Sequence, residues 1–569
     1  MFKFWGVAFP LAELVFLTTM FAVVVLTNRA LQLLSRKELV ISAAIFSPLL
    51  AISFVIGRKI NLWAKPYFEY FKLTDSVYFL MLSMLLFVVV LNLLDFVCSR
   101  SLEISSKEVS YKFLLTVFAI ILLCWLPYLL VYYPANLSPD SFSTINQSIG
   151  ITKYYNHHPI MFTLFAQLFI RLGMSLININ FGCACFSFAQ MSLLSLVLAY
   201  CVYFLKKKGL PLYLLVLVTL FFAVNPVIAM YSITMWKDIL FGGWVLLMIL
   251  YLYEVMETDG ALLRSIRGIS LLGALCMLVA FGRNNGFYVV VAVLFALAVY
   301  FRESFKILVP TFLAIILSIG IIQGPVYTAL NIGKGNFAES VGIPLQQIGY
   351  TMTENGSIRD EPQQFLNQLL PPETIVEVYR PNSPDYIKFH PDFNNGILNE
   401  NQGEFIKAWV NILPANFIKY VKAWLMQTIG YYHIGTTNWV VCGGVMEDYP
   451  GVHNINLIPH IVSPALGNLI PKYINAFARN VPVINLLYSI AFMVWTTFFC
   501  AVVLALRKRA KYIIALLPLI AIWGTMMIAA PTYCEFRYMF SFHLALPFVV
   551  LLMFCSKSDD GWQTTGEVE

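Results

Sequence analysis

Residues 112–132, KFLLTVFAIILLCWLPYLLVY, are almost entirely apolar, and the polar string YPANLSPDSFSTINQ follows directly at 133–147. A helix of roughly 20 apolar residues crosses the hydrocarbon layer of a bilayer, so the first string predicts a transmembrane helix. The second string contains Pro134 and Pro139 and predicts a loop just beyond the membrane. Asp140 is the only acidic side chain in this loop string.

The composition of the whole chain is typical of a membrane protein. Of its 569 residues, 59% are hydrophobic and 12% are charged, whereas soluble domains carry about 25% charged residues. The net charge of +7 comes mostly from short basic loops, which orient membrane helices and require no nucleic-acid partner. Thirteen apolar runs meet the length test, near 9–27, 38–57, 75–97, 112–132, 180–204, 210–230, 237–255, 267–283, 286–301, 306–323, 481–505, 512–530 and 538–555. The sequence therefore predicts an all-α polytopic membrane protein with thirteen transmembrane helices.

Basic loops set the predicted orientation, because loops rich in Lys and Arg stay on the cytoplasmic side. If the loop around Asp140 is outside, six basic loops fall inside: Arg29–Lys37, Arg100–Lys107, Lys206–Lys208, Arg264–Arg267, Arg302–Lys306 and Arg507–Lys511. The N-terminus is then outside and the C-terminal tail is cytoplasmic. The loop at 58–74 carries Arg58, Lys59, Lys65 and Lys72 and is the exception, since it would also lie outside.

Two segments interrupt the apolar runs. The stretch 159–176 would reverse the alternation if it crossed the membrane, so we expect it to lie along the outer surface. The polar stretch 324–480 predicts one extracytoplasmic domain of mixed structure between the tenth and eleventh spans. The predicted divisions are 1–111 (N-terminal transmembrane helices), 112–323 (transmembrane core with an outer catalytic loop, 133–179), 324–480 (extracytoplasmic domain), 481–555 (C-terminal transmembrane helices) and 556–569 (cytoplasmic tail).

Asp140 is the first candidate for a chemical role. A carboxylate at the outer surface can act as a general base for the hydroxyl of an acceptor. The alternative is a helix cap, since Ser-Pro-Asp-Ser at 138–141 is a common signature of a helix start.

Cations stand at the predicted outer ends of three spans: Lys237, Arg283 and Arg537. Charged groups at such depths cost on the order of several kcal/mol unless paired or hydrated, and a guanidinium matches phosphate well. They are candidates for phosphate binding, with structural pairing as the alternative, for example between Lys237 and Asp238. The other candidate substrate-binding residues are His157, His158, Asp238, Asn285, Gln346, Gln347, Glu535 and Tyr538. The His and Cys positions show no spacing that indicates a metal site.

Six short strings share this outward placement: Tyr133-Pro134-x5-Asp140-Ser141-x5-Gln147, Asn156-x-His158-Pro159-x3-Thr163, Trp236-Lys237-Asp238, Arg283-x-Asn285-Gly286, Ile343-Pro344-x-Gln346-Gln347 and Glu535-x-Arg537-Tyr538. As an ordered set they resemble the GT-C type of polytopic membrane glycosyltransferase. More narrowly, they are similar to an uncharacterised bacterial branch associated with surface-polysaccharide synthesis. The resemblance covers about residues 112–555.

The resemblance implies an enzyme of the bacterial plasma membrane. It would move a sugar from a polyprenyl-phosphate donor to a glycan or lipid-linked acceptor on the outer face, with inversion at the anomeric carbon. Asp140 matches the catalytic position, and the three cations would stabilise the departing phosphate. Many GT-C members bind a divalent cation through a second acid in this loop. Here Asp140 stands alone, so no cofactor is firmly predicted and Mg or Mn stays open.

Two other functions would use the same residues. A transporter or flippase of lipid-linked saccharides would use them as a binding vestibule, although related halves and broken helices near mid-membrane are more typical of transporters. A polymerase or ligase that uses diphosphate-linked oligosaccharides would share the topology and the basic lining. For a transferase, we expect Asp140, Lys237, Arg283 and Arg537 to meet in one cavity that opens sideways to lipid.

Overall fold

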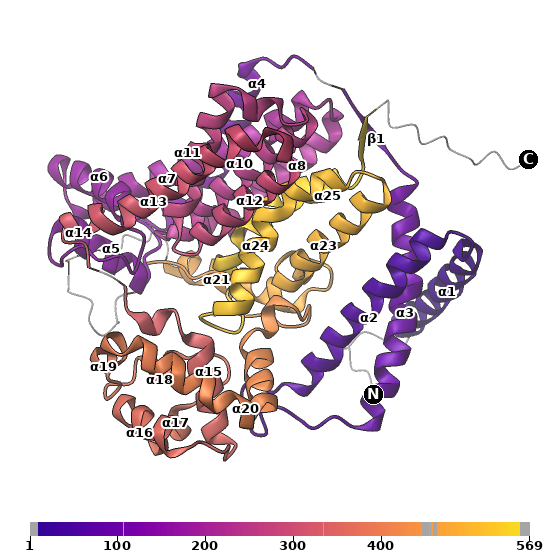
Figure 1. The fold of residues 1–569 in the computed structure, drawn as a ribbon. Helices are drawn as coiled ribbons and strands as arrows, with labels where there is room; N and C mark the ends of the chain where they lie inside the picture. Colours follow the sequence, from indigo (N-terminus) through magenta and orange to yellow (C-terminus); the bar gives the residue numbers. More distant parts are fainter. Residues whose placement is uncertain are drawn as a thin grey trace, which may run out of the picture.

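The computed structural model describes residues 10–105, 107–333, 335–446, 455, 457–458 and 464–557, and nearly all of its regular structure is helical (Figure 1). Within these residues the only strands are β1 (Leu102–Ile104) and β2 (Cys555–Lys557), which pair in parallel. The predicted all-α class is confirmed. Most of the predicted cytoplasmic tail, 558–569, lies outside the described residues.

A helix lies in each of the thirteen predicted apolar ranges. These helices are α1 (Pro10–Leu33), α2 (Lys37–Lys59), α3 (Leu73–Cys98), α4 (Tyr111–Val131), α7 (Ile179–Lys207), α8 (Leu212–Val224), α10 (Lys237–Glu257), α11 (Ile266–Gly282), α12 (Gly286–Tyr300), α13 (Phe305–Ile321), α23 (Ile490–Leu506), α24 (Ile513–Ala529) and α25 (Phe540–Leu552). Among the described residues, seven helical segments are long and apolar enough to cross a membrane, or up to eight if one bent pair counts as a span. The protein thus has the helices of a multi-pass membrane protein.

The bent pair lies in the apolar range predicted at 210–230. α8 ends at Val224, and α9 (Pro226–Ser232) continues at an angle of 54°. Pro226 has no backbone N–H to continue the hydrogen bonding of α8. Asn225 instead caps α9, since its Oδ1 accepts a hydrogen bond from the backbone N–H of Val227 at 3.0 Å.

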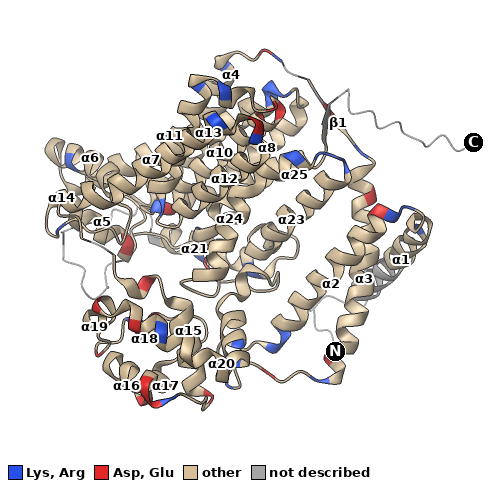
Figure 2. Ribbon diagram, viewed as in Figure 1, with Lys and Arg blue, Asp and Glu red and all other residues tan. Residues whose placement is uncertain are grey.

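The basic loops predicted to lie inside come together at the end of the bundle that carries β1, where Figure 2 shows a group of Lys and Arg residues. Nη2 of Arg507 donates to the carbonyl oxygen of Arg100 at 2.8 Å, and the backbone N–H of Lys107 donates to the carbonyl oxygen of Lys207 at 2.9 Å. Acidic partners join them: Lys208 with Glu254, Lys511 with Asp259, and Arg29 and Arg36 with Asp95. We call this end of the molecule the basic end.

α10 is the central helix and connects the two ends. It is the most deeply buried of the seven candidate spans and packs against α7, α11, α24 and α25. Glu257, its last residue, meets Lys208 at the basic end. Its 21 residues extend about 30 Å, so its first residue, Lys237, lies at the opposite end.

α5 (Pro139–Ile149) and α6 (Ile160–Leu176) lie at that opposite end, beside the start of α7. α7 has 29 residues and reaches the basic end with Lys206 and Lys207, so the short link from α6 joins α7 at the far end. His158, just before α6, meets Lys237 at this same end, so both ends of α6 lie there and α6 does not cross the bundle. Its Leu164, Leu168 and Leu172 form an exposed apolar stripe.

The polar stretch 324–480 is helical, and the prediction of a mixed structure is wrong for its described residues. It contains α14 (Tyr327–Ala329), the 3₁₀ turn η4 (Phe337–Glu339), α15 (Gly342–Thr353), α16 (Asp360–Leu369), α17 (Pro372–Val378), α18 (Asp385–Lys388), α19 (Asn395–Glu400), α20 (Gln402–Gln427) and α21 (Pro464–Asn480), without a strand. α15 to α20 pack on one another, and we call this group of helices the helical subdomain. α21 instead packs on α22 (Ile484–Leu487), nearer the bundle (Figure 1). The apolar faces of these short helices bury one another, so no sheet is needed to form a core.

Candidate functional site

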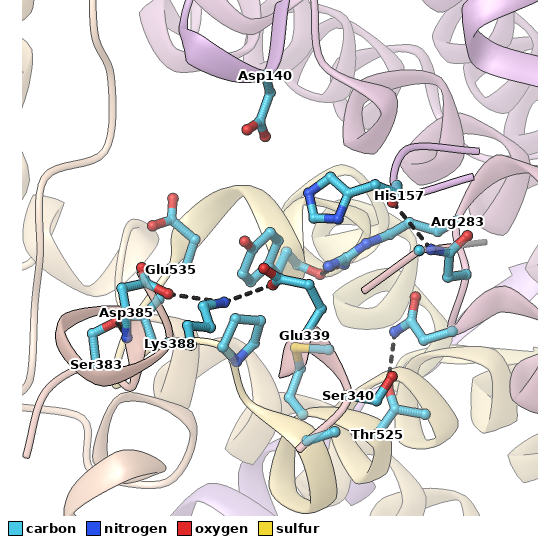
Figure 3. Close-up of a pocket in the computed structure, with 18 of the residues that line it drawn as sticks. Asp140, His157, Arg283, Glu339, Ser340, Ser383, Asp385, Lys388, Thr525 and Glu535 are labelled. Carbon is cyan, nitrogen blue, oxygen red and sulfur yellow. Dashed lines mark hydrogen bonds and ion pairs between the residues drawn. The ribbon is translucent and has the colours of Figure 1, made fainter. Parts of the chain in front are cut away.

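A cavity of about 1420 Å³ lies where α10 begins, between the bundle and the helical subdomain. Side chains from distant parts of the chain line it, as Figure 3 shows for Asp140, His157, Arg283 and Glu535. The predicted site residues that line it are Asp140, His157, His158, Lys237, Arg283, Asn285, Glu535, Arg537 and Tyr538. The expected convergence of Asp140 with the three cations is confirmed.

The cavity also reaches the outer surface of the bundle. Tyr288 of α12 and Ile528 of α24 belong to its lining, and both side chains are exposed. α12 and α24 pack against each other, so this side of the cavity lies along two of the apolar helices. The predicted opening toward lipid stays a prediction.

Asp140 lies in the first turn of α5, but it is not the cap of that helix. Ser138 is the N-cap, and its backbone N–H and side chain both bond the Ser141 hydroxyl, at 3.0 and 3.3 Å. The Asp140 carboxylate is therefore available to the cavity, where its Oδ2 lies 2.7 Å from Nη1 of Arg537. The side chain is 33% exposed.

Asp140 also lies near His158, and His158 in turn contacts Lys237. Nζ of Lys237 donates to Nδ1 of His158 at 2.5 Å, and Nε2 of that ring lies 3.9 Å from Oδ1 of Asp140. Burial and the nearby Lys237 ammonium lower the pKa of His158 well below its ordinary value, so the ring is neutral at pH 7. With Nδ1 accepting, the single ring proton is on Nε2 and faces Asp140.

These charges determine the ionisation of Asp140. Burial opposes the charged form, but the positive charges around the carboxyl, Arg537 above all, outweigh it and hold the pKa of Asp140 below its usual range. Asp140 is ionised in this arrangement and, while Arg537 holds it, is a weak proton acceptor.

Glu535 has the opposite ionisation. Its side chain is only 8% exposed, and Oε1 lies 3.5 Å from Nε of Arg537. Burial raises the pKa of Glu535 to about 7, although the charge of Arg537 opposes this shift. Two carboxyl groups beside one guanidinium thus differ in basicity because of their surroundings, which is the usual arrangement of acid–base pairs in active sites.

Arg537 and Arg283 are both supported by Tyr538. The Arg537 guanidinium carbon lies 4.9 Å from the centre of the Trp236 ring and 5.0 Å from that of Tyr538, positions that favour a cation over an aromatic face. Nη1 of Arg283 donates to the carbonyl oxygen of Tyr538 at 3.2 Å, and Nε lies 3.0 Å from Oδ1 of Asp238. Both guanidinium groups are therefore held in fixed positions at the cavity wall.

The comparisons with known proteins add a family but no activity. Residues 149–567 match a family model described as "Family of unknown function (DUF6020)". The chain belongs to this family. No curated protein and no solved structure matches the chain. The family match contains every predicted site residue except Asp140, which precedes it.

Three residues within the family match are not where the prediction placed them. Gln346 donates to the carbonyl oxygen of Arg380 at 2.8 Å, and Gln347 donates to that of Tyr420 at 3.2 Å and accepts from Trp409. Both glutamines are buried in the helical subdomain and do not line the cavity. An amide pair looks the same in sequence whether it bonds a sugar or the backbone of its own domain.

Asp238 is the third. It pairs with Arg283 behind the cavity wall instead of with Lys237, which faces His158. Asp238 therefore does not line the cavity, as a substrate-binding residue would, and it does not form the predicted pair with Lys237. His157 and Asn285 do line the cavity; Asn285 also donates to the hydroxyl of Thr525 at 2.8 Å.

The sequence reasoning missed a second charged cluster in the same cavity. Lys388 of α18 pairs with Glu339 at 2.6 Å and with Asp385 at 2.9 Å, as the dashed lines in Figure 3 show. One signal was available: Ser-Pro-Asp occurs at 138–140 and again at 383–385, and both copies lie at helix starts beside this cavity. Two tripeptides so far apart in the chain do not predict contact by themselves.

A divalent cation, left open by the sequence, does not fit beside Asp140. Within the described residues, no three His, Cys, Asp or Glu side chains are grouped to hold a metal ion. Asp140 faces Arg537 and the N–H side of His158, and the carboxylates of Glu339 and Asp385 both face Lys388. Such surroundings repel a second cation.

Proposed function

We propose that the protein is a membrane glycosyltransferase that moves a sugar from a polyprenyl-phosphate donor to a glycan or lipid-linked acceptor. The observation that carries this proposal is the meeting of Asp140 with Lys237, Arg283 and Arg537 at one cavity wall. These residues come from α5, from α10, from the C-cap of α11 and from the helical turn Phe536–Met539, and a purely structural bundle has no need to bring them together at a cavity. A volume of about 1420 Å³ exceeds the ~300–1,000 Å³ of a typical small-molecule site, as two bulky substrates require.

The three cations form the donor-phosphate site of this proposal. Arg537 and Arg283 offer planar N–H pairs that suit phosphate oxygens, and Lys237 adds a point charge. Because the aromatic and carbonyl contacts hold these groups in place before substrate binds, they stabilise the negative charge that develops on the departing phosphate. The polyprenyl chain leaves the cavity past Tyr288 and Ile528, toward lipid.

Asp140 is the proposed general base. The acceptor oxygen forms its bond to the anomeric carbon, the bond from that carbon to the phosphate oxygen breaks with its electron pair on phosphate, and the acceptor proton passes to Asp140. Arg537 weakens this base in the empty site, and a donor phosphate that binds Arg537 relieves the effect. The donor therefore both supplies the sugar and activates the base.

The finer architecture belongs to the same proposal. We place the cavity end outside and the basic end in the cytoplasm, with thirteen crossings, the N-terminus outside and a GT-C-like arrangement in a bacterial plasma membrane. The gathering of the predicted inside loops at one end supports this orientation. The exposed apolar stripe of α6 supports its place along the outer leaflet.

The direct test is transfer of label. Purified full-length protein in detergent is incubated with radiolabelled polyprenyl-phosphate sugars and a cell-wall glycan fraction, with Asp140→Asn as the matched inactive variant. We expect label in the glycan with the wild type, also in EDTA, and at least a hundredfold less with the variant. Equal transfer by both proteins, or no transfer with any donor tested, contradicts the proposal.

Reconstituted vesicles separate the transferase from a flippase. A flippase moves a fluorescent lipid-linked saccharide between leaflets without changing it, whereas a transferase consumes the donor and leaves free polyprenyl phosphate. Analysis of the lipid products by thin-layer chromatography distinguishes these outcomes. A diphosphate product would instead indicate the polymerase or ligase.

A further inference from the structure

The cavity has a second end that differs chemically from the cationic wall. Lys388 lies on this side with a side chain only 4% exposed, bound by Glu339 and Asp385. Two carboxylates against one ammonium leave this cluster with an excess negative charge. Burial of Lys388 is possible only because both acids accompany it; together they raise its pKa above the ordinary value despite the burial.

An amide without a hydrogen-bond partner lies beside this cluster. Asn382 lines the cavity and is buried, and its Oδ1 has no hydrogen-bond partner in the structure. Its backbone is fixed, since its carbonyl oxygen accepts from the Thr532 hydroxyl at 3.1 Å and from the Tyr533 N–H at 3.0 Å. A buried amide oxygen without a partner is unfavourable, and a ligand hydroxyl or amine that reaches Asn382 from the cavity can supply the missing hydrogen bond.

Aromatic side chains border the same end. Trp63, Tyr386 and Phe389 line the cavity and are all exposed. Trp63 comes from the loop between α2 and α3, and the centre of its ring lies 6.1 Å from the centre of the Tyr533 ring. This loop therefore closes one side of the cavity. Exposed rings beside fixed amides and carboxylates offer flat apolar faces and directed hydrogen bonds together.

We propose that this end, which we call the Lys388 end, is a saccharide-binding subsite for the acceptor, selective for neutral or amine-bearing sugars over acidic ones. The inference rests on the proposed transferase activity and assigns its acceptor class. Asn382 and the two carboxylates accept bonds from sugar hydroxyls or an ammonium, and Tyr386 and Phe389 pack against the sugar rings. The excess negative charge repels uronic acids and phosphorylated glycans, which keeps the donor phosphate at the cationic wall.

Binding of defined oligosaccharides to the full-length protein, without donor, tests the subsite. The probes are tetramers of glucose, glucosamine and galacturonic acid, followed by titration calorimetry in detergent. We expect the glucosamine and glucose tetramers to bind at least tenfold more tightly than the galacturonate. Equal or tighter binding of the galacturonate, or no binding of any tetramer, overturns the inference.

Variants locate the binding. Tyr386→Ala should weaken binding of the glucose tetramer about tenfold, and Asp385→Asn should narrow the preference for glucosamine over galacturonate, with Glu339 left to pair with Lys388. Tyr473→Ala and Asp360→Asn change exposed residues outside the cavity lining and serve as matched controls. Unchanged binding in both Tyr386→Ala and Asp385→Asn overturns the location.

The two proposals fail in different ways. Saccharide binding without transfer from any polyprenyl-phosphate donor contradicts the transferase and leaves the subsite in place. Transfer that proceeds with an unchanged acceptor KM in Tyr386→Ala and Asp385→Asn contradicts the subsite and leaves the transferase in place. If the subsite is correct, these variants raise the acceptor KM at least tenfold while the donor KM stays the same.

Discussion

Arg537 is the residue on which the charges of the cavity depend. It contacts Asp140 at 2.7 Å and Glu535 at 3.5 Å, and it lies over the rings of Trp236 and Tyr538. An arginine that only compensated buried acids would not need to face the open volume, yet Arg537 lines it.

Replacing Asp140 by asparagine should abolish most of the activity and leave the fold intact. The amide is nearly isosteric, Ser138 still caps α5, and an amide cannot accept the proton of the acceptor. We expect kcat to fall by ~10²–10⁴, the usual contribution of a general base, with an unchanged thermal unfolding midpoint. Asp360→Asn is the control, and near-normal turnover of Asp140→Asn would move the assignment to Glu535.

Replacing Arg537 by alanine should change both the rate and its pH dependence. Loss of the phosphate contact is expected to lower kcat by ~10²–10³, as for one donor to a developing anion. Because Arg537 holds the pKa of Asp140 low, the acid limb of the kcat/KM profile, which reports the free enzyme, should move to higher pH. A variant that is lost from the membrane, or whose acid limb does not move, indicates a structural role instead.

Glu535 should make the folded protein less stable as the pH rises. Its pKa is raised to about 7 in the fold and is about 4.3 in an unfolded chain, so the folded state holds the proton more strongly between these values. The free energy of unfolding then decreases as the pH increases from about 4.3 to 7. The unfolding midpoint of Glu535→Gln, followed by tryptophan fluorescence, should lack this decrease; parallel pH curves for both proteins contradict it.

At the level of helices, α5, α6 and α7 hold Asp140 and His158 in place. Close packing of α6 on α7 depends on Gly173 and Gly182, because a Cβ at Gly182 would lie 2.4 Å from the carbonyl oxygen of Ile170. α6 in turn packs on α5, and His158 immediately precedes the N-cap of α6 at Pro159. The geometry of the proposed base therefore depends on a glycine contact outside the cavity lining.

Gly182→Leu should separate α6 from α7 and lower both stability and activity. Insertion of a side chain into close packing costs ~1–3 kcal/mol, and the displaced α5 would move Asp140 away from Arg537. Gly273→Ala in α11 is the control, because its added Cβ would meet nothing within 4 Å. Thermal unfolding and label transfer are measured on both; a Gly182→Leu protein equal to the Gly273→Ala protein contradicts this role.

The molecule as a whole has two chemically different ends. The basic loops meet at one end through Lys208, Arg507 and Lys511. The cavity and the helical subdomain lie at the other, about 30 Å away along α10. This polarity is what the proposed orientation requires, with the basic loops on one side of the membrane.

Cysteine labelling tests the orientation. In a cysteine-free background, Asp360→Cys on the helical subdomain should react with a membrane-impermeant maleimide in intact cells, whereas Lys207→Cys should react only after permeabilisation. Both residues lie outside the cavity lining. The reverse pattern would place the cavity in the cytoplasm and contradict an outward reaction.

The sequence alone determined the helices and the chemistry available to them. Apolar run length follows from bilayer thickness, so each of the thirteen predicted ranges contains a helix. Cations and acids at span ends were detectable because charge is rare in this chain. The bend at Asn225-Pro226 also follows from the local sequence, because Pro226 has no backbone N–H and Asn225 caps the next helix.

Tertiary structure alone decided which of these residues meet. Gln346 and Gln347 bond their own subdomain, whereas Asp385 and Lys388, from the same polar stretch, line the same cavity as Asp140. Composition and spacing describe residues near one another in the chain. Whether a buried polar group faces a ligand or a neighbouring backbone depends on helix packing, which arises from contacts between residues far apart in the sequence. The pairing of Asp140 with Arg537, 397 residues away, is decided in this way.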